Sequence, residues 1–124
     1  MVQEVRRTLG LYFPTSWTPM TDVYENDEQV VVVVDIAGVD KNQLKITLDG
    51  RTLYIAGRRQ SPCPSASVTI RQMEIDAGEF RRRILLPGFV IFDKSECTYK
   101  DGLLRIVLPK RREGQVTHIP IESE

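Results

Sequence analysis

The residues that could carry out catalysis or bind a metal are few in this chain. His118 is its only imidazole, and Cys63 and Cys97 are its only thiols. The two cysteines form neither a CxxC pair nor a zinc-ligand spacing, and we expect both to be reduced. A catalytic triad or dyad would depend on one histidine in a C-terminal segment, and no glycines cluster as a phosphate-binding loop. We therefore expect no catalytic residue, no metal site and no cofactor.

The C-terminal segment instead has the features of a short peptide that binds in a groove. In an extended chain, Ile119 and Ile121 point in the same direction. Pro120, between them, fixes φ and removes a backbone donor, which makes the segment stiff and a poor central strand. Two apolar side chains on a stiff, hydrophilic tail form a plug with two prongs. Such a plug requires a groove to receive it.

Three consecutive arginines, 81 to 83, allow two interpretations. As a cluster they would suit nucleic acid, but strand alternation separates them. Arg82 shares its face with Phe80 and Ile84, whereas Arg81 and Arg83 lie on the other face. A guanidinium on an apolar face needs a carboxylate to offset its desolvation. We therefore favour a structural or interface ion pair for Arg82 over a contact with nucleic acid.

Length and composition favour a soluble, single-domain protein. The chain has 124 residues, of which 41% are apolar, and 17 basic residues balance 17 acidic ones. That length predicts one domain that buries about two-thirds of its unfolded surface. A net charge of zero gives no reason to expect nucleic acid or a membrane as a partner. Because no apolar run reaches the length of a membrane span or a signal-peptide core, we expect a cytoplasmic protein.

The elements expected to position these residues are short β-strands. Alternating hydrophobicity and hairpin signals at Asp49-Gly50 and Asp101-Gly102 predict strands and no long helix. Five consecutive valines, 30 to 34, predict a strand buried on both faces or nearly so. The expected strands are 30–34, 44–48, 52–57, 78–86, 95–100 and 103–108, with a further short strand within 68–75. Seven to eight strands predict a β-sandwich at residues 21–110, between an N-terminal arm (1–20) and a C-terminal extension (111–124).

The strand that contains Leu44, Ile46 and Leu48 has two interpretations. Its alternation with Lys45 and Thr47 fits an ordinary half-buried core strand. It fits equally well the edge of a groove that accepts an apolar tail by strand addition. The Ile-Pro-Ile tail needs a receptor, so both interpretations stay open at the level of sequence.

The chain also resembles the small heat-shock proteins, the α-crystallin-domain chaperones, of the bacterial and plant type. The resemblance spans about residues 17 to 121 and rests on six short motifs in the family's order. These are the entry segment 17–19, the turn 35–39, the strand 53–59, the stretch 78–82 with Leu86-Pro87, the hairpin 101–104 with Pro109-Lys110, and the tail 119–121. Two positions depart from the family pattern, because Ala37 replaces a proline and Cys97 replaces an alanine.

The resemblance implies an immunoglobulin-like sandwich and an ATP-independent holdase that binds unfolded or partly unfolded client proteins. It further implies a homodimer and a larger homo-oligomer, in which the tail docks into an edge groove of a neighbouring dimer. The groove would lie along Leu44, Ile46 and Leu48 and face residues 96–98 across the sheet edge, with Thr98 assigned to it while the inward parity of that second strand stays open. The dimer interface would contain Arg82 and, on a strand exchanged between protomers, Val68, Ile70 and Met73. The client-binding arm would present Leu9, Leu11, Tyr12, Phe13 and Trp17.

Two other functions compete with the holdase hypothesis. A related sandwich serves as an adaptor to an ATP-driven chaperone and lacks holdase activity, but such modules usually lack both the Ile-x-Ile tail and the exchanged strand. A purely structural, assembly-forming protein is the third candidate, because the N-terminal arm is short for the family. Native mass distinguishes the holdase from the adaptor, because an adaptor would be a monomer and a small heat-shock protein at least a dimer.

Overall fold

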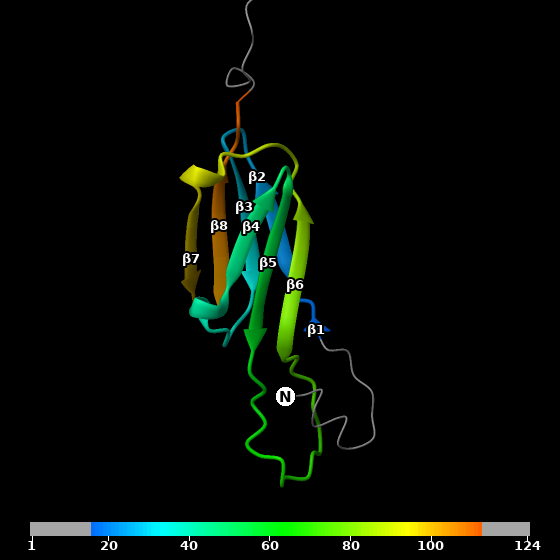
Figure 1. Cartoon of the computed structure of the whole chain (residues 1–124). Helices are drawn as coiled ribbons and strands as arrows, with labels where there is room; N and C mark the ends of the chain where they lie inside the picture. Colours follow the sequence, from blue (N-terminus) through cyan, green and yellow to red (C-terminus); the bar gives the residue numbers. More distant parts are fainter. Residues whose placement is uncertain (1–15, 113–124) are drawn as a thin grey trace, which may run out of the picture.

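The computed structural model describes residues 16–112, which form a sandwich of two four-stranded sheets (Figure 1). The first sheet has the strand order β1-β6-β5-β4, and the second has the order β2-β3-β8-β7. The strands are Ser16–Trp17 (β1), Thr21–Glu25 (β2), Gln29–Asp35 (β3), Lys45–Asp49 (β4), Thr52–Arg59 (β5), Gly78–Leu85 (β6), Glu96–Lys100 (β7) and Leu103–Pro109 (β8). The 3-10 turns η1 (Lys41–Gln43) and η2 (Phe92–Lys94) precede β4 and β7. The predicted all-β sandwich of seven to eight strands is confirmed.

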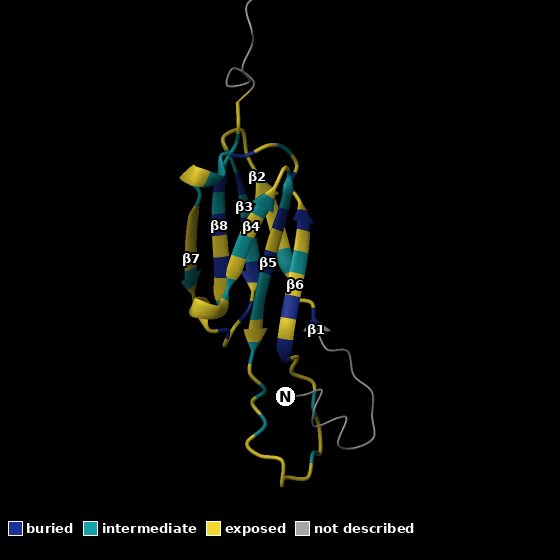
Figure 2. Cartoon of the chain, viewed as in Figure 1, coloured by how far each residue is buried: buried dark blue, intermediate teal, exposed yellow. Residues whose placement is uncertain are grey.

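The core lies between the sheets and is formed mainly by alternate residues of β3, β5, β6 and β8 (Figure 2). In β3, Val30, Val32 and Val34 are fully buried, whereas Val31 and Val33 are only half-buried. The prediction that this strand is buried on both faces or nearly so therefore holds for the inner face and is too strong for the outer one. The outer face of β3 has neighbouring strands but no covering layer, so its valines keep partial contact with solvent.

Close packing at one point of the core requires a glycine. Gly57 of β5 lies opposite Phe80 of β6. A Cβ atom at Gly57 would lie 2.7 Å from two atoms of the Phe80 ring and 3.0 Å from a methyl group of Leu44. The absence of a side chain at Gly57 therefore leaves the space that the fully buried ring of Phe80 occupies.

The two expected hairpins are present, one of them shifted by a residue. In the β7–β8 hairpin, Asp101 and Gly102 have φ values of 55° and 79°, the left-handed pair that a two-residue hairpin loop favours. In the β4–β5 hairpin, Asp49 still pairs with Thr52, so the loop consists of Gly50 and Arg51 rather than Asp49 and Gly50.

Residues 60–77 form a long excursion between β5 and β6 that extends beyond the end of both sheets (Figure 1). The strand expected within Val68–Ile75 is not formed in the single chain. A strand needs a neighbour that accepts and donates its backbone hydrogen bonds, and this segment lies away from both sheets. Its apolar side chains surround an open hollow of about 450 Å³ whose lining includes Cys63, Val68, Ile70, Met73 and Ile75.

Candidate functional site

The two sheets end on the same side of the sandwich in β4 and β7, and we call this side of the sandwich the β4–β7 edge (Figure 1). Ile46 pairs with Ile55 and Leu48 pairs with Leu53, and because both partners are core residues, Ile46 and Leu48 face inward. Together with Leu44 they are half-buried and pack against the core. These three residues therefore pack against the core, as one of the two interpretations expected. Because they are only half-buried, they also leave apolar surface exposed along the β4–β7 edge.

The inward-facing residues of β7 are Cys97 and Tyr99. Cys97 pairs with Ile106 and Tyr99 pairs with Leu104, two buried core residues. Thr98 instead pairs with the exposed Arg105 and lies on the outer face. The placement of Thr98 in the groove is therefore wrong by one residue. The alternation of polar Glu96, Thr98 and Lys100 with less polar Cys97 and Tyr99 was the signal that could have found this.

Tyr99 also fixes the end of the β4–β7 edge. Its hydroxyl donates a hydrogen bond to the carbonyl of Ile36 at 2.7 Å and accepts one from the backbone N–H of Val39 at 3.2 Å. These bonds join β7 to the turn that leads into η1 and β4. At Cys97 on the same face, burial raises the pKa of the thiol above its ordinary value.

On the opposite side of the sandwich the sheets end in β2 and in the two-residue β1, and beyond β1 the strand β6 lies at the margin, so we call this side the β2–β6 edge (Figure 1). Arg82 pairs with the buried Ile55 and faces inward, as its position in the sequence predicted. Its side chain is half-buried, and its Nε atom is buried without a hydrogen-bond partner among residues 16–112. Val23 of β2 faces inward opposite Val32 and is still 42% exposed. This edge therefore combines unfilled apolar surface with an unsatisfied donor.

Trp17 lies in the core rather than on a free arm. β1 pairs in parallel with β6, and the Trp17 Nε1–H donates to the carbonyl of Gly78 at 2.9 Å. The indole is 9% exposed and packs against Phe80, with ring centroids 5.2 Å apart. The assignment of Trp17 to the client-binding arm is therefore wrong, and the arm boundary at residue 20 is too late. A two-residue strand has no periodicity by which the sequence could reveal it.

Arg59 joins three distant segments at the base of the excursion and was not singled out from the sequence. Its guanidinium lies over the Trp17 ring at 4.0 Å from the centroid. It donates to the carbonyl of Asp76 at 2.9 and 2.5 Å and to the carbonyl of Ala37 at 3.1 Å. Arg59 therefore closes the excursion and clamps the entry strand, through contacts that no local sequence pattern indicates.

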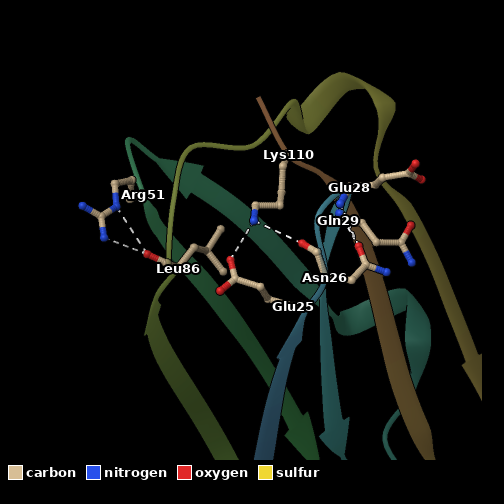
Figure 3. A network of polar contacts seen from close by, with 7 residues as sticks. All are labelled: Glu25, Asn26, Glu28, Gln29, Arg51, Leu86 and Lys110. Carbon is tan, nitrogen blue, oxygen red and sulfur yellow. Dashed lines mark hydrogen bonds and ion pairs between the residues drawn. The ribbon is translucent and has the colours of Figure 1, made fainter. Parts of the chain in front are cut away.

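The start of the C-terminal extension is held by hydrogen bonds at the other end of the sandwich (Figure 3). The Lys110 amine pairs with Glu25 at 3.0 Å and donates to the carbonyl of Asn26 at 3.1 Å. The Lys110 backbone N–H donates to the carbonyl of Glu28 at 2.8 Å, and the Arg111 N–H donates to a loop carbonyl at 2.9 Å. The point from which the extension leaves the domain is thereby fixed.

Several predicted site residues lie outside the described part of the chain. They are the tail residues Ile119, Pro120 and Ile121 and the arm residues Leu9, Leu11, Tyr12 and Phe13. Of the excursion residues, Val68 is exposed, while Ile70 and Met73 are half-buried against their own loop. The structure brings together Leu44, Ile46 and Leu48 at one edge and places Arg82 at the other.

Comparison with known proteins identifies the family. Residues 22–122 match the Hsp20/alpha crystallin family model. Spore protein SP21 of Stigmatella aurantiaca is 31% identical over 110 residues, which cover 89% of this chain and 65% of that protein. Heat shock protein 16.0 from Schizosaccharomyces pombe has a TM-score of 0.75 at 30% identity, covering 93% of this chain and 82% of the other. A small heat-shock protein from Xylella fastidiosa has a TM-score of 0.71 at 28% identity, covering 86% and 98%.

The chain therefore belongs to the Hsp20/alpha crystallin family. Its relatives include small heat shock proteins from bacteria and plants, as the sequence motifs predicted. Membership in this family supports a role as a chaperone. The chain spans about two-thirds of the length of two of its curated relatives, 65% of SP21 and 68% of small heat shock protein C2 of Rickettsia felis. Within residues 16–112, no helix is long and apolar enough to cross a membrane.

Proposed function

We propose that this protein is an ATP-independent holdase that assembles from dimers through its Ile-Pro-Ile tail. The observation that supports this most is the β4–β7 edge. Its inward residues Ile46 and Leu48 are two positions apart on one strand, as Ile119 and Ile121 are in the tail. In extended chains this spacing is about 7 Å, so two prongs and two apolar positions match.

The β2–β6 edge supports the dimer half of the proposal. A buried guanidinium nitrogen without a partner costs about 1–3 kcal/mol, and the Nε of Arg82 is in this position within the described chain. A second protomer at this edge would supply an acceptor for Arg82 and cover Val23. The apolar excursion residues Val68, Ile70 and Met73 are the part of the partner that we assign to this contact.

Holdase action follows from the exposure of apolar surface to partly unfolded proteins. The arm residues Leu9, Leu11, Tyr12 and Phe13, and the β4–β7 edge when no tail occupies it, would bind apolar segments of a client. Binding the unfolded form lowers its free concentration and hence its aggregation. Because tail and client would compete for the same edge, dissociation of the tail should increase client binding.

The test of assembly is the double variant Ile119→Ala/Ile121→Ala, with Ser123→Ala as the matched control. Native mass by light scattering should fall to that of a smaller species in the double variant and stay unchanged in the control. Cys97, which faces inward at the edge, should become faster to alkylate when the tail is lost, while Cys63 in the excursion serves as an internal reference. Equal mass and equal Cys97 labelling would rule out tail docking.

The dimer contact is tested with Arg82→Leu against Arg81→Leu. Arg82 faces inward at the β2–β6 edge, whereas Arg81 is exposed on the outer face. Arg82→Leu should shift the dissociation of the dimer to higher protein concentration, and Arg81→Leu should not. Holdase activity is tested by thermal aggregation of a model client, which stoichiometric protein should suppress. A monomeric native mass with no suppression would favour the adaptor alternative.

A further inference from the structure

The Ile-Pro-Ile motif reads the same in both directions, so its apolar prongs alone do not determine how the tail lies along β4. The apolar contacts are equally good in two arrangements. In one, Ile119 lies next to Ile46 and Ile121 next to Leu48, and in the other the two isoleucines of the tail exchange places. The residues that flank the motif are different, however. Glu122 and Glu124 follow it directly, whereas residues 114–118 before it contain no acid. In the residues next to the motif, negative charge therefore lies on one side only, and the nearest acid on the other side is Glu113.

The β4–β7 edge also has two electrically different ends. β4 begins with Lys45 and ends with Asp49, and β7 begins with Glu96 and ends with Lys100. Figure 1 shows the arrows of β4 and β7 pointing in opposite directions. Both lysines therefore lie at the η1 end, which we call the lysine end, and both acids lie at the η2 end, which we call the acid end.

All four of these residues are exposed, and none forms an ion pair within residues 16–112. Nearby charges reduce the contrast between the ends without reversing it. The lysine end also has Lys41, Asp40 and Asp101, and the acid end also has Asp93, Lys94 and Arg51. Of these, Asp40 is engaged with the Asn42 N–H, and Arg51 donates to the carbonyl of Leu86. Over the charges named here, the lysine end keeps a positive sum and the acid end a negative one, and Asp35, which pairs with Leu103 on β8, is a further acid toward the lysine end.

We propose that the docked tail runs antiparallel to β4, with its acidic end at the lysine end of the edge. This rests on the proposed function and adds the direction and the ionic contacts of the docked tail. Ile121 then lies next to Ile46 and Ile119 next to Leu48. Glu122 points away from the core, on the side where Lys45 projects from β4, and Glu124 extends toward Lys41. The reverse direction would place Glu122 beside Asp49 and Glu96, and like charges at that distance repel.

The direction is tested on the full-length assembly with a carbodiimide, which joins a carboxylate and an amine as an amide with loss of one water. Only groups already in contact react, and peptide mass spectrometry identifies the pairs. We expect Glu122 or Glu124 joined to Lys45, Lys100 or Lys41. Products that join these glutamates to Lys94, at the acid end, and none that join them to the lysine end would overturn the proposal.

Charge reversal provides a second, independent measurement. Lys45→Glu/Lys100→Glu should weaken tail docking by about tenfold, because each exposed pair contributes about two- to five-fold and reversal adds repulsion. Asp49→Lys/Glu96→Lys is the matched control and should not weaken docking. Adding Glu122→Lys/Glu124→Lys to the first variant should restore it. Docking is read from native mass on dilution and from the alkylation rate of Cys97, and circular dichroism checks the fold.

The outcomes separate this inference from the proposed function. If Ile119→Ala/Ile121→Ala lowers the native mass while both charge reversals have no effect, the tail docks but its direction is not set by charge. The same conclusion follows if the control variant weakens docking and the lysine variant does not. If the alanine variant leaves the mass unchanged, tail docking itself is refuted, whatever the charge variants do.

Discussion

Replacement of Trp17 tests whether this residue belongs to the folded domain or to a client-binding arm. The structure gives the indole three interactions: a hydrogen bond to Gly78 at 2.9 Å, packing on the Phe80 ring, and the Arg59 guanidinium at 4.0 Å from its centroid. With 9% of its surface exposed, Trp17 is as buried as other core residues at the margin of the sandwich. Trp17→Ala removes all three interactions at once and unpins β1 from β6.

The expected loss of unfolding free energy is about 3–5 kcal/mol for Trp17→Ala, the usual cost of removing a buried aromatic side chain. Trp17→Phe keeps most of the packing but loses the N–H donor, so it should cost only about 1–2 kcal/mol. Both values are large fractions of the stability of a small domain.

The assay is urea unfolding followed by far-ultraviolet circular dichroism, because Trp17 is the only tryptophan and its removal eliminates the fluorescence signal. All variants must be compared at one protomer concentration, since association stabilises the folded state. The reasoning is refuted if Trp17→Ala unfolds within about 0.5 kcal/mol of wild type. If Trp17→Ala lost protection of the client at unchanged stability, Trp17 would instead be a client-binding residue of the arm.

Three further predictions concern stability and thiol chemistry. Gly57→Ala should lower the free energy of unfolding by about 1–3 kcal/mol, because the added methyl group would lie 2.7 Å from a buried phenylalanine ring. Gly88→Ala is the control: its methyl group meets no atom within 4 Å, so the urea unfolding curve should change little. Tyr99→Phe should cost about 1–2 kcal/mol in urea unfolding, since its hydroxyl both donates and accepts a hydrogen bond; an unchanged midpoint would contradict this. Burial raises the pKa of the Cys97 thiol, so its alkylation rate should rise at a higher pH than that of a cysteine in a short peptide; a midpoint at or below the peptide value would contradict this.

The sequence predicted the sandwich because its signals are local and repeated. Alternation identified β4 to β8 to within a few residues, and Asp101-Gly102 located a hairpin whose two loop residues both need positive φ. The run of valines in β3 indicated a strand correctly but concealed its two faces, because every position carries the same residue. Which valine is buried depends on the layer opposite, which the run itself does not encode.

The candidate site was less accessible to sequence because it depends on register and on distant contacts. Leu44, Ile46 and Leu48 were found by alternation, but Thr98 was assigned to the wrong face by one residue. Trp17 was placed on the arm because the bond that anchors it joins residues 61 positions apart. Contacts at such separations become visible only once both sheets are assembled.

Lys110 is held by an ion pair with Glu25 and by hydrogen bonds to Asn26 and Glu28, which has a consequence for the geometry of the proposed assembly. These contacts turn the C-terminal extension into a tether with a rigid origin. Ile119 lies only seven residues beyond Arg112, so its reach is at most about 25 Å. Within that radius the local concentration of the tail is high, and outside it is zero. In the proposed assembly, the length of this tether, rather than the affinity of its two isoleucines, would select which neighbouring domains can be joined.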